Sequence, residues 1–225
     1  MCNLYQTTPR ETISMKFAVG APVGGYATTA APLKPAPFIT AGAAALVGQW
    51  GMIPPSSPMR KPTLPNGRPM STNNARRERV NVAPTYRRAW QAGRRCLIPA
   101  DSFDEPYWGT EKNIWWRFWR ADSEPWALAG IWDDWTDSST GEVVPNFSML
   151  TQNCDGHPLL SLMHKPDPTK GPQAQDKRAV VPVERAHWDE WLRGSVSQAE
   201  ALIQVPGVEL FRHGAADPAK QVLLL

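Results

Sequence analysis

Residues 95–105 of the chain read RCLIPADSFDE. Within this stretch, residues 96–99 form a short apolar run that ends near proline and aspartate, a pattern that is typical of a strand. Because most such runs in this sequence are short and bounded by Pro, Gly, Asp or Ser, they indicate an antiparallel or mixed sheet. The other runs lie at residues 46–53, 114–119, 126–132, 146–150 and 179–183.

Helical segments are expected between these strands. Residues 84–92 end at Gly93 and residues 184–193 end at Gly194, and glycine in the C′ position favours helix termination. A last helix is expected from Ser197. Strands and helices do not alternate regularly, so we expect an α+β fold rather than a Rossmann-type domain. Its core is a curled, barrel-like antiparallel or mixed sheet with flanking helices.

Length and composition favour one domain spanning residues 1–225. A chain of 225 residues with 42% hydrophobic residues can bury a sizeable core. It has no apolar run of about 18 residues, and its first twenty residues lack the pattern of a secretory signal. We therefore expect a cytoplasmic protein with no membrane contact. Residues 20–45 are expected to form irregular structure and short extended pieces rather than helix, and residues 165–177 to form a surface loop.

The cysteines indicate free thiols. Cys2, Cys96 and Cys154 are widely spaced and include no C-x-x-C pair, which argues against a disulfide framework and against a zinc ribbon. A metal site built from Cys154, His157 and His164 has irregular spacing and lacks a fourth ligand. We therefore expect no metal and no cofactor.

The charge of the chain is unevenly distributed. Between Arg60 and Arg95 there are ten basic residues and one acid, Glu78, which gives this segment +9 and leaves −6 on the rest of a chain whose net charge is +3. Such a run can be a solvated face. Arginine dominates it, however, and the planar guanidinium suits phosphate oxygens, so a polyanion-binding surface is the alternative.

Eleven tryptophans are many for this length. Most are expected to pack in the core and on the sheet. One or two could instead stack on unpaired bases, because every base offers a π-face and such stacking is worth roughly 1–3 kcal/mol.

The second residue carries distinctive chemistry. Methionine aminopeptidases remove Met1 when a small residue follows, which leaves Cys2 as an N-terminal 1,2-aminothiol. An α-amine has a pKa of about 7.7–8.0, so it is far more often neutral at cellular pH than a lysine with a pKa near 10.4. The amine can attack an aldehyde, and the neighbouring thiol can then close a five-membered thiazolidine on the same carbon.

Five segments together resemble the SRAP family, the SOS-response-associated peptidase or abasic-site-processing proteins. The resemblance runs nearly from end to end, and the order and spacing of the segments make it specific. The matching segments are MCNLY (1–5), WGMIP (50–54), NARRE (74–78), RCLIPADSFDE (95–105) and His164.

This resemblance implies a sensor of abasic sites in single-stranded DNA. Such a protein forms a thiazolidine cross-link that shields the lesion from strand cleavage, and it removes its own Met1. The expected partner is therefore single-stranded DNA that contains abasic sites. The protein is expected to be monomeric and associated with the nucleoid when bound to DNA.

The resemblance also implies roles for the matched residues. Cys2 is the nucleophile through its amine and its thiol, and Glu105 is the general acid and base that moves protons during dehydration and ring opening. His164 favours the open sugar by protonating or hydrogen-bonding its hydroxyl. Asn74 holds Cys2 or the opened sugar, although the adjacent Asn73 leaves the register open. The expected DNA contacts are Trp50, Arg76, Arg77 and Arg178.

Three positions depart from the family pattern. Leu4 stands where the common form has an arginine that contacts phosphate. Glu105 is followed by Pro106, Tyr107 and Trp108 where many relatives have tryptophan at once. The arginine that usually follows His164 closely is displaced by residues 165–177, which leaves Lys165 or Arg178 as candidates for its role.

Two other functions compete with this reading. In an N-terminal-nucleophile amidase or a cysteine peptidase, Cys2 attacks an acyl carbon, which accounts for Cys2 and His164 but not for the +9 segment. In a non-covalent DNA-binding module, the arginines carry the function and Cys2 has no chemical role. A cross-link that survives denaturing electrophoresis separates the proposed chemistry from the second alternative.

Overall fold

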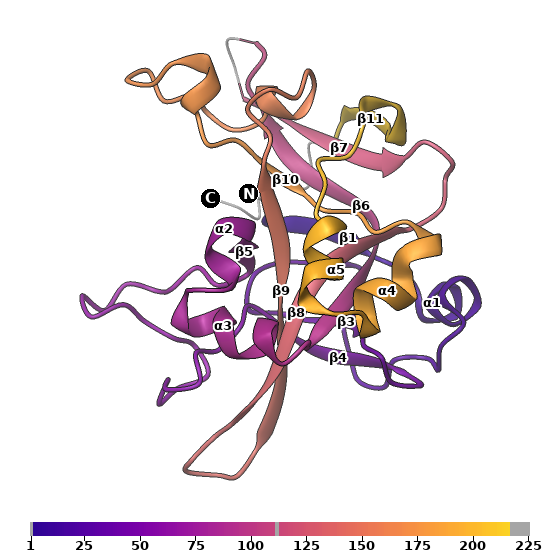
Figure 1. The fold of residues 1–225 in the computed structure, drawn as a ribbon, viewed down its shortest axis with the longest axis vertical. Coiled ribbons are helices and arrows are strands. Elements are labelled where there is room, and N and C mark those ends of the chain that lie inside the picture. The colour runs from indigo at the N-terminus through magenta and orange to yellow at the C-terminus, as the bar shows by residue number, and fades with distance from the viewer. Residues whose placement is uncertain (1, 111–112, 217–225) are drawn as a thin grey trace.

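A computed structural model describes residues 2–110 and 113–216 of the chain (Figure 1). Its centre is a closed barrel of five strands with mixed directions. Strand β9 pairs with β4 in parallel, and the remaining neighbours in the order β4, β3, β6, β8 and back to β9 pair antiparallel. The barrel strands are β3 (Pro35–Ile39), β4 (Ala45–Trp50), β6 (Arg95–Tyr107), β8 (Trp126–Thr136) and β9 (Val143–Asn153).

Shorter strands extend this barrel at its edges. The long strand β6 pairs with β8 over its first half, and its second half pairs with β1 on one side and with β7 on the other. Strands β5 and β10 both pair with β9, β2 pairs with β1, and β11 pairs with β7. These strands are β1 (Leu4–Thr7), β2 (Thr29–Ala30), β5 (Asn74–Arg76), β7 (Ile114–Arg120), β10 (Arg178–Val180) and β11 (Phe211–Ala215).

Alternation along the barrel strands separates two apolar cores. On β8, Trp126 and Leu128 point into the barrel, where they join Phe38 and Phe147. The residues between them face outward and pack beneath the helices. Parallel pairing of β4 with β9 depends on Gly48, because a Cβ atom there would lie 2.5 Å from the carbonyl oxygen of Pro145.

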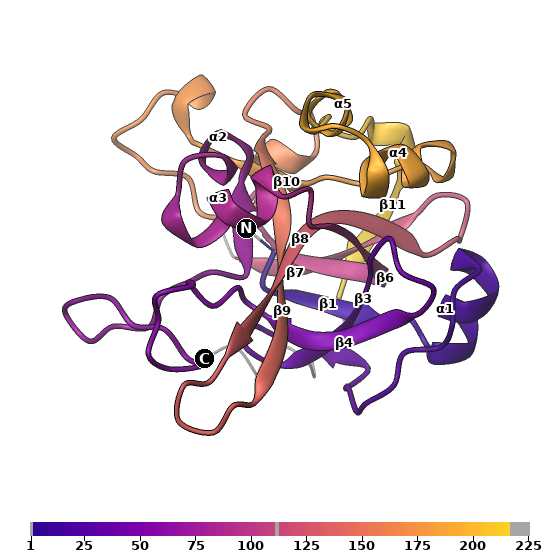
Figure 2. The ribbon, with the colours of Figure 1, turned by 60° about the horizontal axis from the view of Figure 1, so that its bottom comes forward.

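Helices cover the outer core. In Figure 2, α2, α3, α4 and α5 lie above the strands of the barrel, and β4 lies below them. Helix α3 starts with Pro84 at its first turn and buries Tyr86, Ala89 and Trp90. The helices are α1 (Arg10–Phe17), α2 (Arg77–Val80), α3 (Pro84–Gln91), α4 (Trp188–Arg193) and α5 (Val196–Ala201), with 3₁₀ turns η1 (Leu160–Leu162), η2 (Pro172–Ala174), η3 (Arg185–His187) and η4 (Val208–Leu210).

The expected α+β class with a curled, barrel-like sheet and flanking helices is confirmed. Gly93 has φ +69° just after α3, as a glycine in the C′ position should. Gly194 differs from the expectation, because it is the C-cap of α4 and is extended at φ −65° and ψ 171°. A Cβ atom there would lie 2.4 Å from the carbonyl oxygen of Glu190, so close contact explains this glycine.

Two elements near the N-terminus, β1 and α1, were not predicted from the sequence. Both are short, and α1 has Pro9 at its N-cap without a side-chain cap. Strand β6 also extends much further than residues 96–99, because its second half is paired on both edges. No helix among the described residues is long and apolar enough to cross a membrane.

Candidate functional site

Two asparagines hold the second residue of the chain. Cys2 lies just before β1 and is completely buried. Its carbonyl oxygen accepts hydrogen bonds from Asn74 Nδ2 at 2.7 Å and from Asn73 Nδ2 at 3.2 Å. Asn73 Nδ2 also donates to Asn3 Oδ1 at 3.0 Å. Cys2 is therefore fixed against β5, and Asn73 shares the role that the sequence gave to Asn74 with the register left open.

Trp50 supports this pair of asparagines from the barrel interior. Its indole Nε1 donates to the carbonyl oxygen of Asn73 at 3.0 Å, and its ring packs edge-on against Tyr5 with ring centroids 4.8 Å apart. Trp50 has no exposed surface. In this conformation it offers no face to a base, so the predicted DNA contact at Trp50 is replaced by a packing role.

Glu105 and His164 form a close pair beside Cys2. His164 Nε2 lies 2.7 Å from Glu105 Oε2, and the glutamate side chain is 5% exposed against 30% for the histidine. The chain passes from η1 alongside the end of β6, where the amide of His164 donates to the carbonyl oxygen of Pro106 at 2.7 Å. This backbone contact brings together two residues that the sequence separates widely.

The environment of Cys2 and that of Glu105 shift the pKa values of the two side chains in opposite directions. Burial, and secondly the negative charge of Glu105, raises the pKa of the Cys2 thiol well above its ordinary value. Burial alone would raise the pKa of Glu105, but positive charge around it, including that of His164, outweighs burial and lowers its pKa. At neutral pH the Cys2 thiol is therefore neutral and the Glu105 carboxylate is ionised. Glu105 can thus accept a proton.

The predicted DNA-contacting arginines differ in exposure. The Arg76 side chain is 42% exposed and lies 2.8 Å from Asp176 Oδ2. Arg77 is exposed and donates to Gln152 Oε1 at 3.0 Å. Arg178 is buried and pairs with both Glu78 and Asp176. Arg77 is thus accessible without breaking an ion pair, whereas a ligand that binds Arg76 must compete with Asp176 and one that binds Arg178 must compete with both of its ion pairs.

The +9 segment is not one continuous binding surface. Arg88 and Arg94 both pair with the buried carboxylate of Asp133. Arg95 is buried and donates to the carbonyl oxygens of Trp191 and Gly194, where it satisfies the C-terminal end of α4. Arg60 and Arg88 are exposed and form ion pairs with Glu142 and Asp133. The other exposed basic residues of the segment are Lys61, Arg68, Arg77, Arg79 and Arg87.

His157 has a structural role. Its Nδ1 accepts from the amides of Leu159 and Leu160 at 3.1 and 2.9 Å, and its Nε2 lies 2.9 Å from the carbonyl oxygen of Pro206. Both ring nitrogens are thus committed to the backbone, which removes His157 from the metal alternative considered from the sequence.

The departures from the family pattern lie around the site. Leu4 is buried on β1 and provides no charge in place of arginine. Lys165 is exposed next to His164, with its ammonium 5.7 Å from the centre of the Trp108 ring. Of the two candidates for the displaced arginine, Lys165 is therefore the accessible one, and Arg178 is buried.

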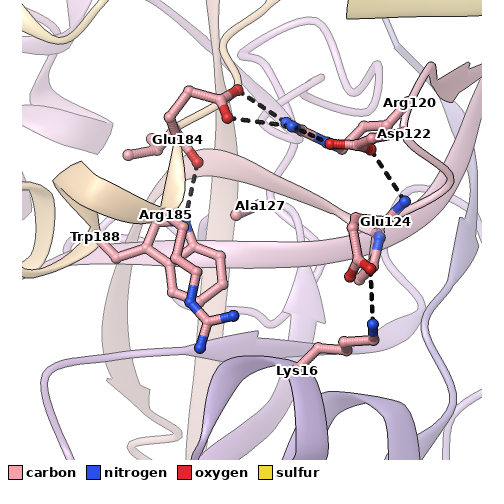
Figure 3. A pocket seen from close by; sticks show the side chains of 10 residues that line it. Lys16, Arg120, Asp122, Glu124, Ala127, Glu184, Arg185 and Trp188 are labelled. Carbon is pink, nitrogen blue, oxygen red and sulfur yellow. Dashed lines mark hydrogen bonds and ion pairs between the residues drawn. The ribbon is translucent and has the colours of Figure 1, made fainter.

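Two pockets differ in their relation to this site. A pocket of about 610 Å³ opens beside His164 and is also lined by Trp108, Lys170 and Lys177. Figure 3 shows a different pocket, of about 300 Å³, that includes none of the candidate site residues. Its charged side chains pair with each other, as Lys16 does with Glu124 and Arg120 with Asp122 and Glu184.

Sequence reasoning missed two residues of this neighbourhood, Asp176 and Lys177. It named Asn73 only as an alternative register for Asn74, and the signal for it was the asparagine doublet. Asp176 and Lys177 carry no such signal, since they lie in a segment whose composition indicates only a loop.

Comparisons with known proteins identify the family and the fold. The model of the family described as SOS response associated peptidase (SRAP) matches residues 1–212. The crystal structure of a protein from Bordetella bronchiseptica has 29% sequence identity and a TM-score of 0.84, and the match covers 96% of this chain and 100% of that one. No curated protein matches the chain.

Two further solved structures share the fold. A protein from Bacteroides thetaiotaomicron has 18% identity and a TM-score of 0.79, with 98% of this chain and 94% of that one covered. A phage-related protein from Bordetella bronchiseptica has 16% identity and a TM-score of 0.62, with 96% and 93% covered.

Proposed function

Because the chain belongs to the SOS response associated peptidase (SRAP) family, we propose that it recognises abasic sites in single-stranded DNA and bonds to them covalently through Cys2. One observation carries the proposal: Asn73 and Asn74 bind the backbone of Cys2, and the Cys2 thiol lies within the electrostatic influence of Glu105, the partner of His164. The reaction requires a free α-amine on Cys2, and Met1, whose removal supplies it, lies outside the described residues.

The chemistry needs no cofactor and no change of oxidation state. The α-amine of Cys2 attacks the aldehyde carbon of the ring-opened sugar and gives a carbinolamine, which loses one water to form an imine. The thiol then adds across the C=N bond, with sulfur going to carbon and the proton to nitrogen. The product is a thiazolidine that joins the chain to the DNA.

Glu105 moves the protons in these steps. Its lowered pKa leaves it as a carboxylate at neutral pH, so it acts first as a base towards the attacking amine. The protonated carboxyl can then return the proton to the hydroxyl that leaves as water. It acts as a base again when the thiol closes, because the raised pKa of the Cys2 thiol keeps that group protonated.

His164 acts on the sugar. Opening of the sugar ring frees a hydroxyl, and the partly exposed imidazole would protonate or hydrogen-bond that oxygen while its Nε2 contacts Glu105. The aldehyde form is thereby favoured. The two asparagines are neutral, so they orient Cys2 without adding charge to a site that depends on one ionised carboxylate.

The DNA partner is held by exposed cations around this site. Arg76 and Arg77 sit at the junction of β5 and α2, directly after the asparagines that bind Cys2. A strand whose phosphates contact these side chains would present its lesion to Cys2. We further propose that the protein acts as a monomer in the cytoplasm, and at the nucleoid when bound to DNA.

The test uses an oligonucleotide that contains one abasic site, incubated with the purified protein and separated by denaturing electrophoresis. We expect a shifted band that survives denaturation. A matched oligonucleotide with a tetrahydrofuran residue, which has no aldehyde, should bind under native conditions and give no such band. Binding of both oligonucleotides without a denaturation-resistant band would favour the non-covalent DNA-binding module and overturn the proposal.

A further inference from the structure

A buried lysine contacts the backbone carbonyl groups on both sides of the His164 Cα atom. Lys177 is 6% exposed, and its Nζ donates to the carbonyl oxygen of Met163 at 2.7 Å and to that of His164 at 2.6 Å. The two residues are separated from Lys177 by the loop at residues 165–176. The lysine therefore closes the base of this loop.

The backbone that Lys177 contacts has an unfavourable conformation. His164 has φ +62°, in the left-handed region that residues with a Cβ atom adopt only at a cost. Its amide is held by the carbonyl oxygen of Pro106 and its carbonyl by Lys177, so both polar groups of the residue are fixed. Conformations of this kind persist when the surrounding contacts over-determine them.

Lys177 is itself anchored independently of His164. Its amide donates to Asp155 Oδ1 at 2.7 Å, and the amide of Asp176 donates to Asp155 Oδ2 at 3.0 Å. Its carbonyl oxygen accepts from the amide of Cys154 at 2.9 Å, which continues the pairing of β10 with β9. The lysine thus links His164 to the rigid sheet.

We propose that Lys177 is a positioning residue that holds the imidazole of His164 against Glu105 for the reaction at abasic sites. Its ammonium contacts the backbone carbonyl groups of Met163 and His164, and it acts through the backbone of His164. The inference rests on the proposed function for its kinetic consequence, but the geometric part concerns the protein without DNA. The two parts therefore have separate measurements.

The first measurement follows His164 in the free protein. In Lys177→Met, the imidazole NMR signals of His164 should shift and its amide should exchange with solvent faster than in the wild type. The matched control is Lys170→Met, because Lys170 is an exposed lysine of the same loop and its removal changes the net charge equally. Unchanged imidazole signals and amide exchange in Lys177→Met would overturn the proposal, whatever the activity.

The second measurement is a double-mutant cycle on the rate of cross-linking. We expect Lys177→Met to be roughly tenfold slower or more, since a small misplacement of a catalytic group has effects of this size. If the lysine acts through His164, the double variant Lys177→Met with His164→Gln should be no slower than His164→Gln alone. Additive losses would show a general structural effect and overturn the positioning role.

A second, more conservative variant tests the proposal even if Lys177→Met does not fold. Lys177→Gln keeps hydrogen-bond donors on a shorter side chain, so it should fall between the wild type and Lys177→Met in both measurements. If the wild type gives no adduct while the His164 signals still respond to Lys177, the proposed function fails and the positional role stands. If the wild type cross-links and the cycle is additive, only the positioning role fails.

Discussion

His164 Nε2 lies 2.7 Å from Glu105 Oε2 across two segments that are 59 positions apart in the sequence. One partner sits near the end of the longest strand of the barrel and is buried, and the other follows a 3₁₀ turn and is half-exposed. A buried carboxylate is thereby connected to an imidazole that is partly exposed. Several measurable consequences depend on this pair and on its surroundings.

Replacing Glu105 with Gln should slow both formation and reversal of the cross-link. Glutamine has nearly the same shape but cannot exchange a proton, and by microscopic reversibility one shuttle serves both directions. Rates of both reactions are measured by quenching time points onto denaturing gels. The exposed Glu124→Gln serves as the control, and equal rates for the wild type and Glu105→Gln would remove Glu105 from the chemistry.

Replacing Cys2 with Ala should abolish the durable cross-link, because a thiazolidine needs sulfur. The new N-terminal amine can still form an imine, which borohydride reduction would trap. The two products are separated by running reduced and unreduced samples side by side. Full yield of untrapped adduct from Cys2→Ala contradicts the mechanism.

A non-cleavable tag before Met1 should also prevent cross-linking, although it leaves the Cys2 thiol in place. The tag converts the amine into an amide, which cannot condense with an aldehyde, and a thiol alone gives only a reversible hemithioacetal. Native binding to single-stranded DNA should be nearly unchanged. The same tag at the C-terminus is the control, and mass spectrometry of active protein should show that Met1 is absent. Normal cross-linking by the N-terminally blocked protein would assign the reaction to another nucleophile.

Charge reversal at Arg76 should weaken binding to single-stranded DNA. The variant Arg76→Glu places an anion where a phosphate is expected, and loss of one phosphate contact should reduce the slope of log K against log salt by about 0.7. Binding is titrated at several salt concentrations. Arg193→Glu on α4 changes the net charge equally at a site outside the proposed interface. An Arg76→Glu variant with the wild-type affinity and slope would exclude this contact.

Removing Asp104 should destabilise the fold. Its carboxylate, 1% exposed, accepts two hydrogen bonds of 2.7 Å from Arg117, whose side chain is 12% exposed. Asp104→Ala leaves the guanidinium buried without this partner, and losses of about 3–5 kcal/mol are usual for such changes. Urea unfolding measures the free energy. The exposed Asp122→Ala should lose far less, and equal losses for the two variants would contradict the argument.

The sequence predicted the class of the fold well because short strands bounded by turn residues repeat along it. It pointed to the candidate site for a different reason, since residues 74–78 and 95–105 are compact motifs whose order is specific. Residues 74–76 and 95–105 lie on paired strands, so local sequence and final position agree there. Strand β1 escaped prediction because its four residues carry little pattern of their own and depend on pairing with β6.

The side-chain roles that the sequence did not reveal depend on contacts between residues that are distant along the chain. Arg95 counts as a cation of the basic segment, yet the structure uses it to satisfy the end of α4. Trp50 belongs to a motif of the family, yet its ring is enclosed by the barrel. Residue type predicts what a side chain can bind, whereas exposure and pairing decide what it does bind.

The carboxylate of Asp176 contacts both Arg76 and Arg178. A phosphate that approaches Arg76 must therefore exchange with an anion that the protein already carries. This exchange lowers the affinity for any polyanion, because the ion pair lost offsets part of the ion pair gained. Under the proposed function, an intact strand would then dissociate readily, and residence on DNA would become long only where an aldehyde permits a covalent bond.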